Sequence, residues 1–164
     1  MEKGINLAIT KSLADFDTLL EKAIVEVSSK KLAVLHGHPD SAWEFQVGKY
    51  VRIHGDNAED EDEAPVFWVG YGWEEKGEHE SILWLEFDAE NCSVEVWEKL
   101  NRLVGTSGKY YSKADFEFAQ VYMNAWVHFY LREEYLERFY GEKADLNAQK
   151  DILTGFIGEI LEKI

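Results

Sequence analysis

The chain has 164 residues, and its 32 acidic residues outnumber 17 basic ones, which gives a formal net charge of −15. A chain of this length is expected to form one domain and to bury about 70% of the surface that it exposes when unfolded. Direct binding to a phosphate backbone needs lysine and arginine to displace counterions, so the charge argues against a nucleic-acid-binding protein. It also argues against adsorption on an anionic membrane, whereas it suits solubility or attraction to a basic partner.

Cysteine content and the N-terminal sequence bear on the compartment. Cys92 is the only cysteine, so no intramolecular disulfide can form and a reducing, cytoplasmic location is favoured. Residues 1–7 lack the apolar run of a signal peptide, and no stretch approaches the roughly 20 apolar residues that span a bilayer. We therefore expect a cytoplasmic protein with no membrane segment.

The N-terminal third predicts one helix and two strands. Apolar residues recur at helical spacing over residues 13–28, and Ser12 is a suitable N-cap. Residues 31–36 form a short apolar segment that is followed by glycine and proline, and this pattern favours a strand. Residues 43–54 alternate between apolar and polar side chains. A two-residue turn at Gly48-Lys49 is the alternative there, but a continuous strand keeps all the apolar side chains on one face, so we prefer the strand.

An acidic loop separates this region from the hairpin at the centre of the predicted sheet. Residues 56–64 are expected to form a mobile loop, because dense like charges repel one another and cannot pack. The loop is also the predicted docking element for a basic partner, and its acids are Asp56, Glu59, Asp60, Glu61, Asp62 and Glu63. Residues 66–73 and 81–88 are rich in aromatic and β-branched residues, and a polar segment with Gly77 joins them.

The C-terminal half reads as helical. A short helix is predicted over residues 94–104, with Gly105 in the position that commonly ends a helix. Residues 113–140 contain no glycine or proline and predict one long, mostly buried helix of about 42 Å. A last helix is predicted over residues 145–163, where Gly155 and Gly158 suggest close packing on another helix.

Together these elements predict a single α+β domain over residues 1–164. Its expected architecture is an antiparallel sheet of three to four strands packed against three to four helices, including one long helix in the C-terminal half. The hairpin glycines Gly70 and Gly72 indicate a bulge or a helix packed close to the sheet. They also permit a ligand pocket, whose candidate lining residues are Trp68, Tyr71, Trp73 and Trp84.

Two groups of polar residues are candidates for chemistry. His36, His38 and Asp40, with His54 and Asp56, have side chains that suit a divalent metal, although ordinary turn chemistry explains the same residues. Glu86, Asp88 and Glu90 alternate at the end of a strand, where acids more often face water or cap the next helix than act in acid–base catalysis.

Known catalytic motifs are absent from the sequence. Pro39-Asp40 is not followed by the acid-x-lysine spacing of a PD-(D/E)XK nuclease site, and no phosphate-binding loop or nucleophile elbow occurs. Cys92 lies at a predicted helix start, where its pKa could be lowered, although a lone cysteine is more often structural. The sequence therefore indicates neither a catalytic residue nor a cofactor.

We rank three functions on these observations. The first is a non-catalytic interaction protein whose acidic surface binds a basic protein, as an inhibitor, an immunity protein or a nucleic-acid mimic would. The second is a small-molecule-binding or metal-dependent enzymatic domain that uses the aromatic pocket, with His36, His38 or Glu86 supplying polar groups. The third is an oligomeric structural subunit whose long aromatic helix forms the contact between copies.

Overall fold

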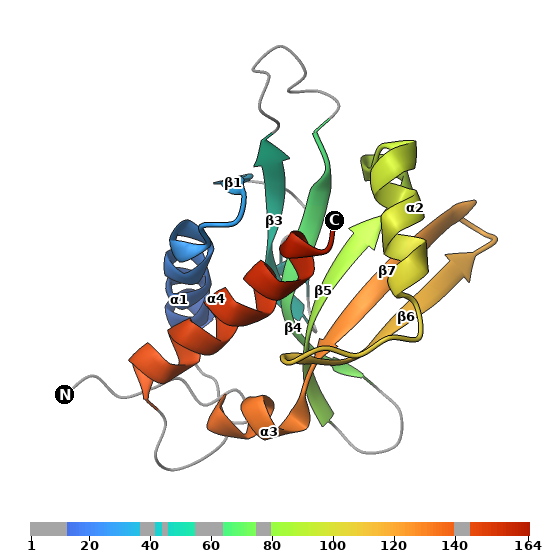
Figure 1. Ribbon diagram of the computed structural model, residues 1–164. Helices are drawn as coiled ribbons and strands as arrows, with labels where there is room; N and C mark the ends of the chain where they lie inside the picture. The colour runs from blue at the N-terminus through green and yellow to red at the C-terminus, as the bar shows by residue number, and fades with distance from the viewer. Residues whose placement is uncertain (1–12, 37–41, 44–45, 55–63, 75–79, 140–144) are drawn as a thin grey trace.

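A computed structural model describes residues 13–36, 42–43, 46–54, 64–74, 80–139 and 145–164, and shows a sheet with helices on one face (Figure 1). Its strands follow the spatial order β1-β3-β4-β5-β7-β6, and β2 pairs with β3 as well. Every neighbouring pair of strands is antiparallel. The elements in chain order are α1 (Leu13–Glu26), β1 (Lys31–Val34), β2 (Ala42–Trp43), β3 (Gln46–His54), β4 (Val66–Glu74), β5 (Glu80–Asp88), η1 (Ala89–Asn91), α2 (Val94–Leu103), β6 (Tyr111–Ala119), β7 (Asn124–Leu131), α3 (Glu133–Leu136), η2 (Glu137–Phe139) and α4 (Leu146–Glu162).

The predicted α+β class is confirmed. The sheet is antiparallel and packs against helices, and the long helix of the C-terminal half is α4. The sheet has more strands than the three or four expected, because the β6–β7 hairpin extends it beyond β5. Among the described residues no helix combines the length and hydropathy needed to cross a bilayer.

The predicted central hairpin is also confirmed. Strands β4 and β5 pair from Phe67 opposite Phe87 to Glu74 opposite Glu80, and they lie in the middle of the sheet. β3 continues through Gly48 and Lys49, so the alternative turn at these residues does not form. Val47, Val51 and Ile53 share one face of β3 as predicted and are buried there. The prediction of one continuous strand over residues 43–54 is wrong at its start, because Trp43 belongs to β2, which pairs antiparallel with β3 and places Trp43 opposite Gln46.

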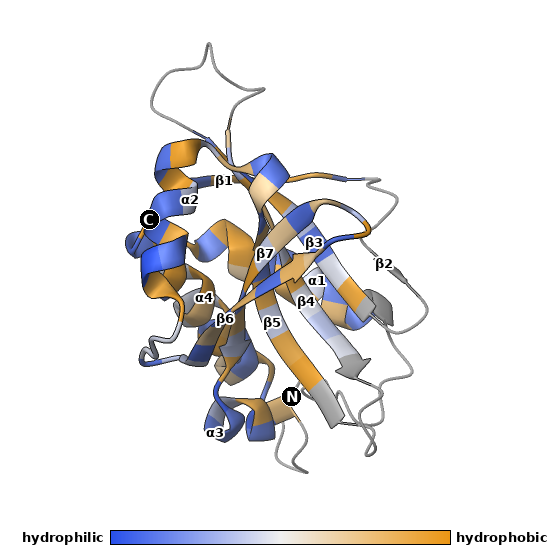
Figure 2. Cartoon of the chain, turned by 90° about the vertical axis from the view of Figure 1, so that its right-hand side faces the viewer, coloured by the Kyte–Doolittle hydropathy of each residue, from blue (hydrophilic) through white to orange (hydrophobic). Residues whose placement is uncertain are grey.

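Helices cover one face of the sheet (Figure 1). α1 packs on α4, where the Thr154 hydroxyl donates a hydrogen bond to the Ala23 carbonyl, and both helices supply buried apolar residues to the core. α2 lies beside the C-terminal end of α4, since the Lys99 ammonium donates to the Ile164 carbonyl. No described helix passes in front of β3, β4 and β5 when the molecule is turned by 90° (Figure 2). We call this side of the sheet, over which no described helix lies, the open face.

The prediction of one long helix over residues 113–140 is wrong. The described residues of this segment, 113–139, form the β6–β7 hairpin from the third residue of β6 onward, followed by α3 and η2. Lys113, Asp115 and Glu117 alternate with Ala114 and other apolar residues, which is the period of a strand rather than of a helix. A segment without glycine and proline can form a helix, but it need not. Here polar residues alternate with apolar residues, and the segment is rich in aromatic and β-branched side chains, both of which favour a strand.

A left-handed residue allows the chain to reverse between β6 and β7 without glycine. Met123 has φ of 49°, in the region that few non-glycine residues adopt. The Tyr122 and Met123 amides donate to the Ala119 and Gln120 carbonyls and close the turn. No sequence pattern predicts a methionine in the left-handed conformation, so the turn between β6 and β7 could not be predicted from the sequence.

Close packing explains only one of the two glycines in α4. A Cβ atom at Gly155 would collide with the Tyr110 ring, which belongs to a loop rather than to a helix. At Gly158 the same atom would meet nothing within 4 Å. The expectation that both glycines allow another helix to approach is therefore wrong.

Candidate functional site

Trp68 and Trp84 lie on the open face, in contact with each other. Their ring centroids are 4.6 Å apart with the planes tilted by 41°. Trp68 is only 2% exposed, because its indole lies over the backbone of Gly48 and Gly70. A Cβ atom at either glycine would collide with that indole. Gly48 and Gly70 therefore make room for a side chain of the protein itself, and the predicted ligand slot at this position is filled by Trp68. The predicted bulge or closely packed helix is wrong for Gly70, because β4 pairs through this residue without a register shift and the neighbouring atoms belong to β3 and Trp68.

The other two pocket candidates do not join this pair. Tyr71 points to the helix-covered face, where its ring packs edge-on against Phe16 with centroids 4.8 Å apart. Tyr71 and Trp68 therefore cannot line one pocket. The side chain of Trp73 lies outside the part of the chain that the structure describes.

A histidine between two glutamates lies next to the tryptophan pair. His128 of β7 places its Nε2 atom 3.1 Å from Glu86 Oε2, and its Nδ1 atom 3.6 Å from Glu117 Oε2. The indole N–H of Trp84 donates to the same Glu86 oxygen at 2.9 Å. The His128 side chain is 12% exposed and the Glu117 side chain is 61% exposed, so the cluster runs from a half-buried centre to solvent.

Sheet register explains why these residues meet. Glu86 is directly opposite His128 in the β5–β7 pair, and His128 is opposite Asp115 in the β7–β6 pair. Glu117 is opposite Trp126, one diagonal step from His128. Side chains at such positions on one face lie close enough to interact.

Aromatic rings and carboxylates therefore alternate across the half of the open face formed by β5, β7 and β6. Lys113 already occupies one such arrangement, with its ammonium 5.1 Å from the Tyr130 ring centroid and 2.7 Å from Asp115 Oδ2. We call this region the acidic–aromatic face, and it consists of Trp84, Glu86, Asp115, Glu117, Trp126, His128 and Tyr130.

The predicted metal ligands are not brought together in the described residues. His36 is exposed, with Nε2 3.6 Å from Glu21 Oε1 of α1, and His54 ends β3 opposite Lys31. His38, Asp40 and Asp56 lie outside the described residues, as do all six acids of the predicted docking loop. Where the structure is described, no group of three histidine, cysteine or acidic side chains is placed to hold a metal.

The remaining candidates at the end of β5 have structural roles. Asp88 Oδ1 accepts hydrogen bonds from the Glu90 amide and from the Asn124 side chain, so it caps η1 and holds the start of β7. Burial, and secondarily the Asp88 carboxylate, raise the pKa of the Cys92 thiol to about 12. The idea of a lowered cysteine pKa is therefore wrong, since a thiol that stays protonated is a poor nucleophile.

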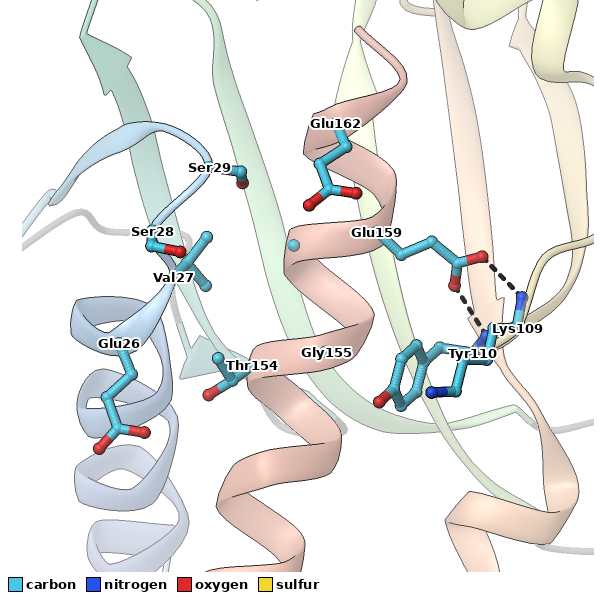
Figure 3. Close-up of a pocket in the computed structure, with 11 residues that line it drawn as sticks. Glu26, Val27, Ser28, Ser29, Lys109, Tyr110, Thr154, Gly155, Glu159 and Glu162 are labelled. Atoms are coloured by element: carbon cyan, nitrogen blue, oxygen red, sulfur yellow. Dashed lines mark hydrogen bonds between the residues drawn. The ribbon is translucent and has the colours of Figure 1, made fainter.

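Two of the cavities that described residues line lie away from the acidic–aromatic face. One, of about 360 Å³, lies between the end of α1 and α4 (Figure 3). Its Glu159 carboxylate accepts from the Lys109 and Tyr110 amides at 2.6 and 2.7 Å, and Glu26 pairs with Lys150 at 2.8 Å. The other, of about 480 Å³, is lined by Arg52 and the residues around Cys92. In the first cavity, Glu159 and Glu26 therefore make contacts that stabilise the fold.

Comparison with known proteins adds no relative. No protein-family model, curated protein or solved structure matches the chain.

Sequence reasoning missed His128, Glu117 and Trp126 as site residues, because all three lie in the segment predicted as a helix. The alternation of residues 113–119 was the available signal. It places Asp115 and Glu117 on one face of a strand, next to whichever strand follows.

Proposed function

We propose that this protein is a non-catalytic interaction domain that binds a basic protein partner through its acidic–aromatic face. The observation that carries the proposal is the alternation of carboxylates and aromatic rings on a sheet face that no described helix covers. Glu117 and Trp126 are directly opposite each other on adjacent strands, so a cation placed between them meets both.

Charge and ring chemistry support this kind of partner. An arginine or lysine side chain over a tryptophan or tyrosine ring gains about 0.5–2 kcal/mol, depending on its exposure to water. The net charge of −15 attracts a basic protein over a longer range and speeds the encounter. The protein's own Lys113 shows the arrangement expected for a partner's cation, between the Tyr130 ring and the Asp115 carboxylate.

The described geometry favours binding over catalysis. His128 and Glu86 form a pair that could move a proton, but the one cysteine has a pKa of about 12. On the open face, the ring of Trp68 also fills the space above Gly48 and Gly70 that a ligand would need. We expect the partner to meet this protein in the reducing cytoplasm.

Two matched charge-reversal variants test the proposal. Asp115→Lys with Glu117→Lys reverses two exposed acids of the acidic–aromatic face. Glu98→Lys with Glu134→Lys changes the net charge by the same amount on α2 and α3, where both residues are exposed. Each immobilised variant is incubated with lysate of the producing cells at low salt, and retained proteins are identified and then eluted with increasing salt.

The expected result is a basic protein that the wild type and the α2–α3 variant retain at low salt, and that the acidic–aromatic variant does not retain. An equal loss of retention in both variants relative to wild type would show that net charge, rather than this face, selects the partner. Capture of no basic protein by any of the three would contradict the proposal as a whole.

The oligomeric alternative loses its premise, because the long aromatic helix that would form the contact between copies is absent. The oligomeric state itself stays a prediction, which light scattering of the purified chain measures. A small ligand on the acidic–aromatic face is the remaining alternative, and it would appear as lysate capture of no protein together with a thermal shift by a cationic metabolite.

A further inference from the structure

Strand β6 is an edge of the sheet, and part of its outer edge is unpaired. The Ala114 amide donates to the Thr106 carbonyl and the Ala114 carbonyl accepts from the Gly105 amide, so the outward-pointing groups of this residue are satisfied. In an antiparallel pair the outward direction recurs at every second residue. The backbone groups of Phe116 and Phe118 therefore also point away from β7, and they have no backbone partner among the described residues.

Exposed apolar side chains gather at the same edge. Five of the seven large hydrophobic residues exposed in the described part of the chain belong to the β6–β7 hairpin, and Phe116 and Phe118 are 49% and 54% exposed. The other three, Val121, Tyr122 and Met123, form its turn. Exposed apolar residues clustered in one place mark an interaction surface more often than scattered ones do.

The two faces of β6 differ in chemistry. Phe116 and Phe118 share the helix-covered side of the sheet with Ala114, whereas Asp115 and Glu117 belong to the acidic–aromatic face. A strand added at this edge would place alternate side chains against the two phenylalanines and against the two acids. The matching strand has apolar residues alternating with lysine or arginine.

A second copy of the chain does not match this pattern. The antiparallel register that pairs Phe116 with Phe118 of the copy places Glu117 opposite Glu117. The register centred on Phe116 places Asp115 opposite Glu117. Like charges directly opposite each other destabilise a strand pair, so self-association through β6 is disfavoured.

We propose that β6 is a strand-addition site for an extended segment in which basic and apolar residues alternate. This inference rests on the proposed function and specifies how the basic partner binds. The partner strand hydrogen-bonds to the backbone of Phe116 and Phe118, its apolar side chains cover the two rings, and its cations lie beside Asp115 and Glu117.

Synthetic peptides separate strand addition from charge attraction. The first probe is the seven-residue peptide Arg-Val-Arg-Val-Arg-Val-Arg, and the second has the same composition in blocks, Arg-Arg-Arg-Arg-Val-Val-Val. A third is the alternating peptide with its valine amides N-methylated, and a fourth has its arginine amides N-methylated. Only one of these two sets of amides can face β6, since they point to opposite edges of the added strand. Affinities for the full chain are measured by titration calorimetry, and the mass of the free chain by light scattering.

The expected result is that the alternating peptide binds about tenfold more tightly than the block peptide, because only the alternating peptide can hydrogen-bond to β6 with its valines on the two phenylalanine rings and its arginines beside the two acids. One N-methylated peptide should lose that advantage and the other should keep it. The variant Phe116→Pro, which removes an outward amide, should bind the alternating and block peptides equally, and the peptide comparison stands even where this variant fails to fold.

Equal affinity for alternating and block peptides, lost in Asp115→Lys/Glu117→Lys, would overturn strand addition and leave the proposed function standing. Binding of none of the peptides would overturn both. A dimer whose formation Phe116→Pro abolishes would also overturn the inference, because a second copy would then occupy the edge.

Discussion

Two glycines three residues apart in α4 experience opposite surroundings. A side chain at Gly155 would collide with the Tyr110 ring, and that ring cannot withdraw easily, since it packs on Tyr135 with centroids 4.9 Å apart. We expect Gly155→Ala to lower the free energy of unfolding by about 1–3 kcal/mol, the usual cost of overpacking. Gly158→Ala meets no atom and should raise it by about 0.5–1 kcal/mol through helix propensity.

Urea unfolding of the two variants measures both changes. The pair is internally controlled, because each replaces glycine by alanine in the same helix. Destabilisation by both substitutions to the same extent would show that the contact with Tyr110 is not what distinguishes them.

Cys92 provides a test of burial at a single atom. Because its thiol pKa is about 12 rather than the ordinary 9.0, native Cys92 should react with iodoacetamide at pH 8 at least about tenfold more slowly than the urea-unfolded chain. Mass spectrometry of timed samples measures both rates. A native rate equal to the unfolded rate would mean that the thiol is ionised and accessible.

The same pKa shift gives stability a pH dependence of known sign. Between pH 9 and about 12 the unfolded chain loses the thiol proton while the native chain keeps it, so the unfolded state binds fewer protons and stability falls as pH rises. Below pH 9 both states keep the proton and the contribution is constant. The decline from pH 8 to pH 10 in urea unfolding should therefore be smaller in Cys92→Ala than in wild type, and an identical decline would contradict the assignment.

At the scale of elements, one carboxylate fixes the loop that leads into β6. Glu159 of α4 accepts two backbone amides, from Lys109 and Tyr110, and its side chain is only 16% exposed (Figure 3). Charge-assisted hydrogen bonds of this kind contribute about 1.5–3 kcal/mol each. The loop therefore depends on α4 for its position.

We expect Glu159→Gln to lower the free energy of unfolding by about 1–3 kcal/mol, because the amide group offers one uncharged acceptor in place of two. Glu162→Gln, on the same helix at an exposed position, is the control and should change it by less than about 0.5 kcal/mol. Thermal unfolding followed by circular dichroism compares the two, and equal effects would mean that the loop does not depend on Glu159.

Local patterns predicted most elements of the fold. The helix α1, the strands β1, β3, β4 and β5, and the helices α2 and α4 all follow from apolar periodicity and end signals. Gly105 has φ of 83° just after α2, and the Asp145 side chain caps α4 by accepting from the Asn147 and Ala148 amides. These signals lie within a few residues of the feature that they specify.

The hairpin β6–β7 required information that is not local. Its residues alternate, but their aromatic content also fits a buried helix, and the reversal depends on the left-handed Met123 instead of a glycine. Pairing of β7 with β5 then decides the outcome and brings His128 opposite Glu86. The candidate site could be predicted only in part for the same reason: Trp68, Trp84 and Glu86 come from the predicted hairpin, whereas His128, Glu117 and Trp126 come from the missed one.

At the scale of the whole molecule, the sheet separates two functions. One face is used for stability, because α1, α2 and α4 cover it and bury its apolar side chains. The other face has no described helix over it, and its β5–β7–β6 half combines acids with aromatic rings. In our proposal that half, with the exposed edge of β6, is where a basic segment binds.

The tryptophan indole resonances test this claim most directly, because the molecule contains its own control. Trp84 and Trp126 belong to the acidic–aromatic face, whereas Trp97 of α2 packs against the core on the helix-covered side. In the ¹⁵N-labelled chain titrated with the alternating arginine–valine peptide, we predict that the indole N–H signal of Trp126, which lies opposite Glu117, shifts in a salt-dependent manner while that of Trp97 stays in place. No shift of the Trp126 signal, or an equal shift of the Trp97 signal, would contradict the account.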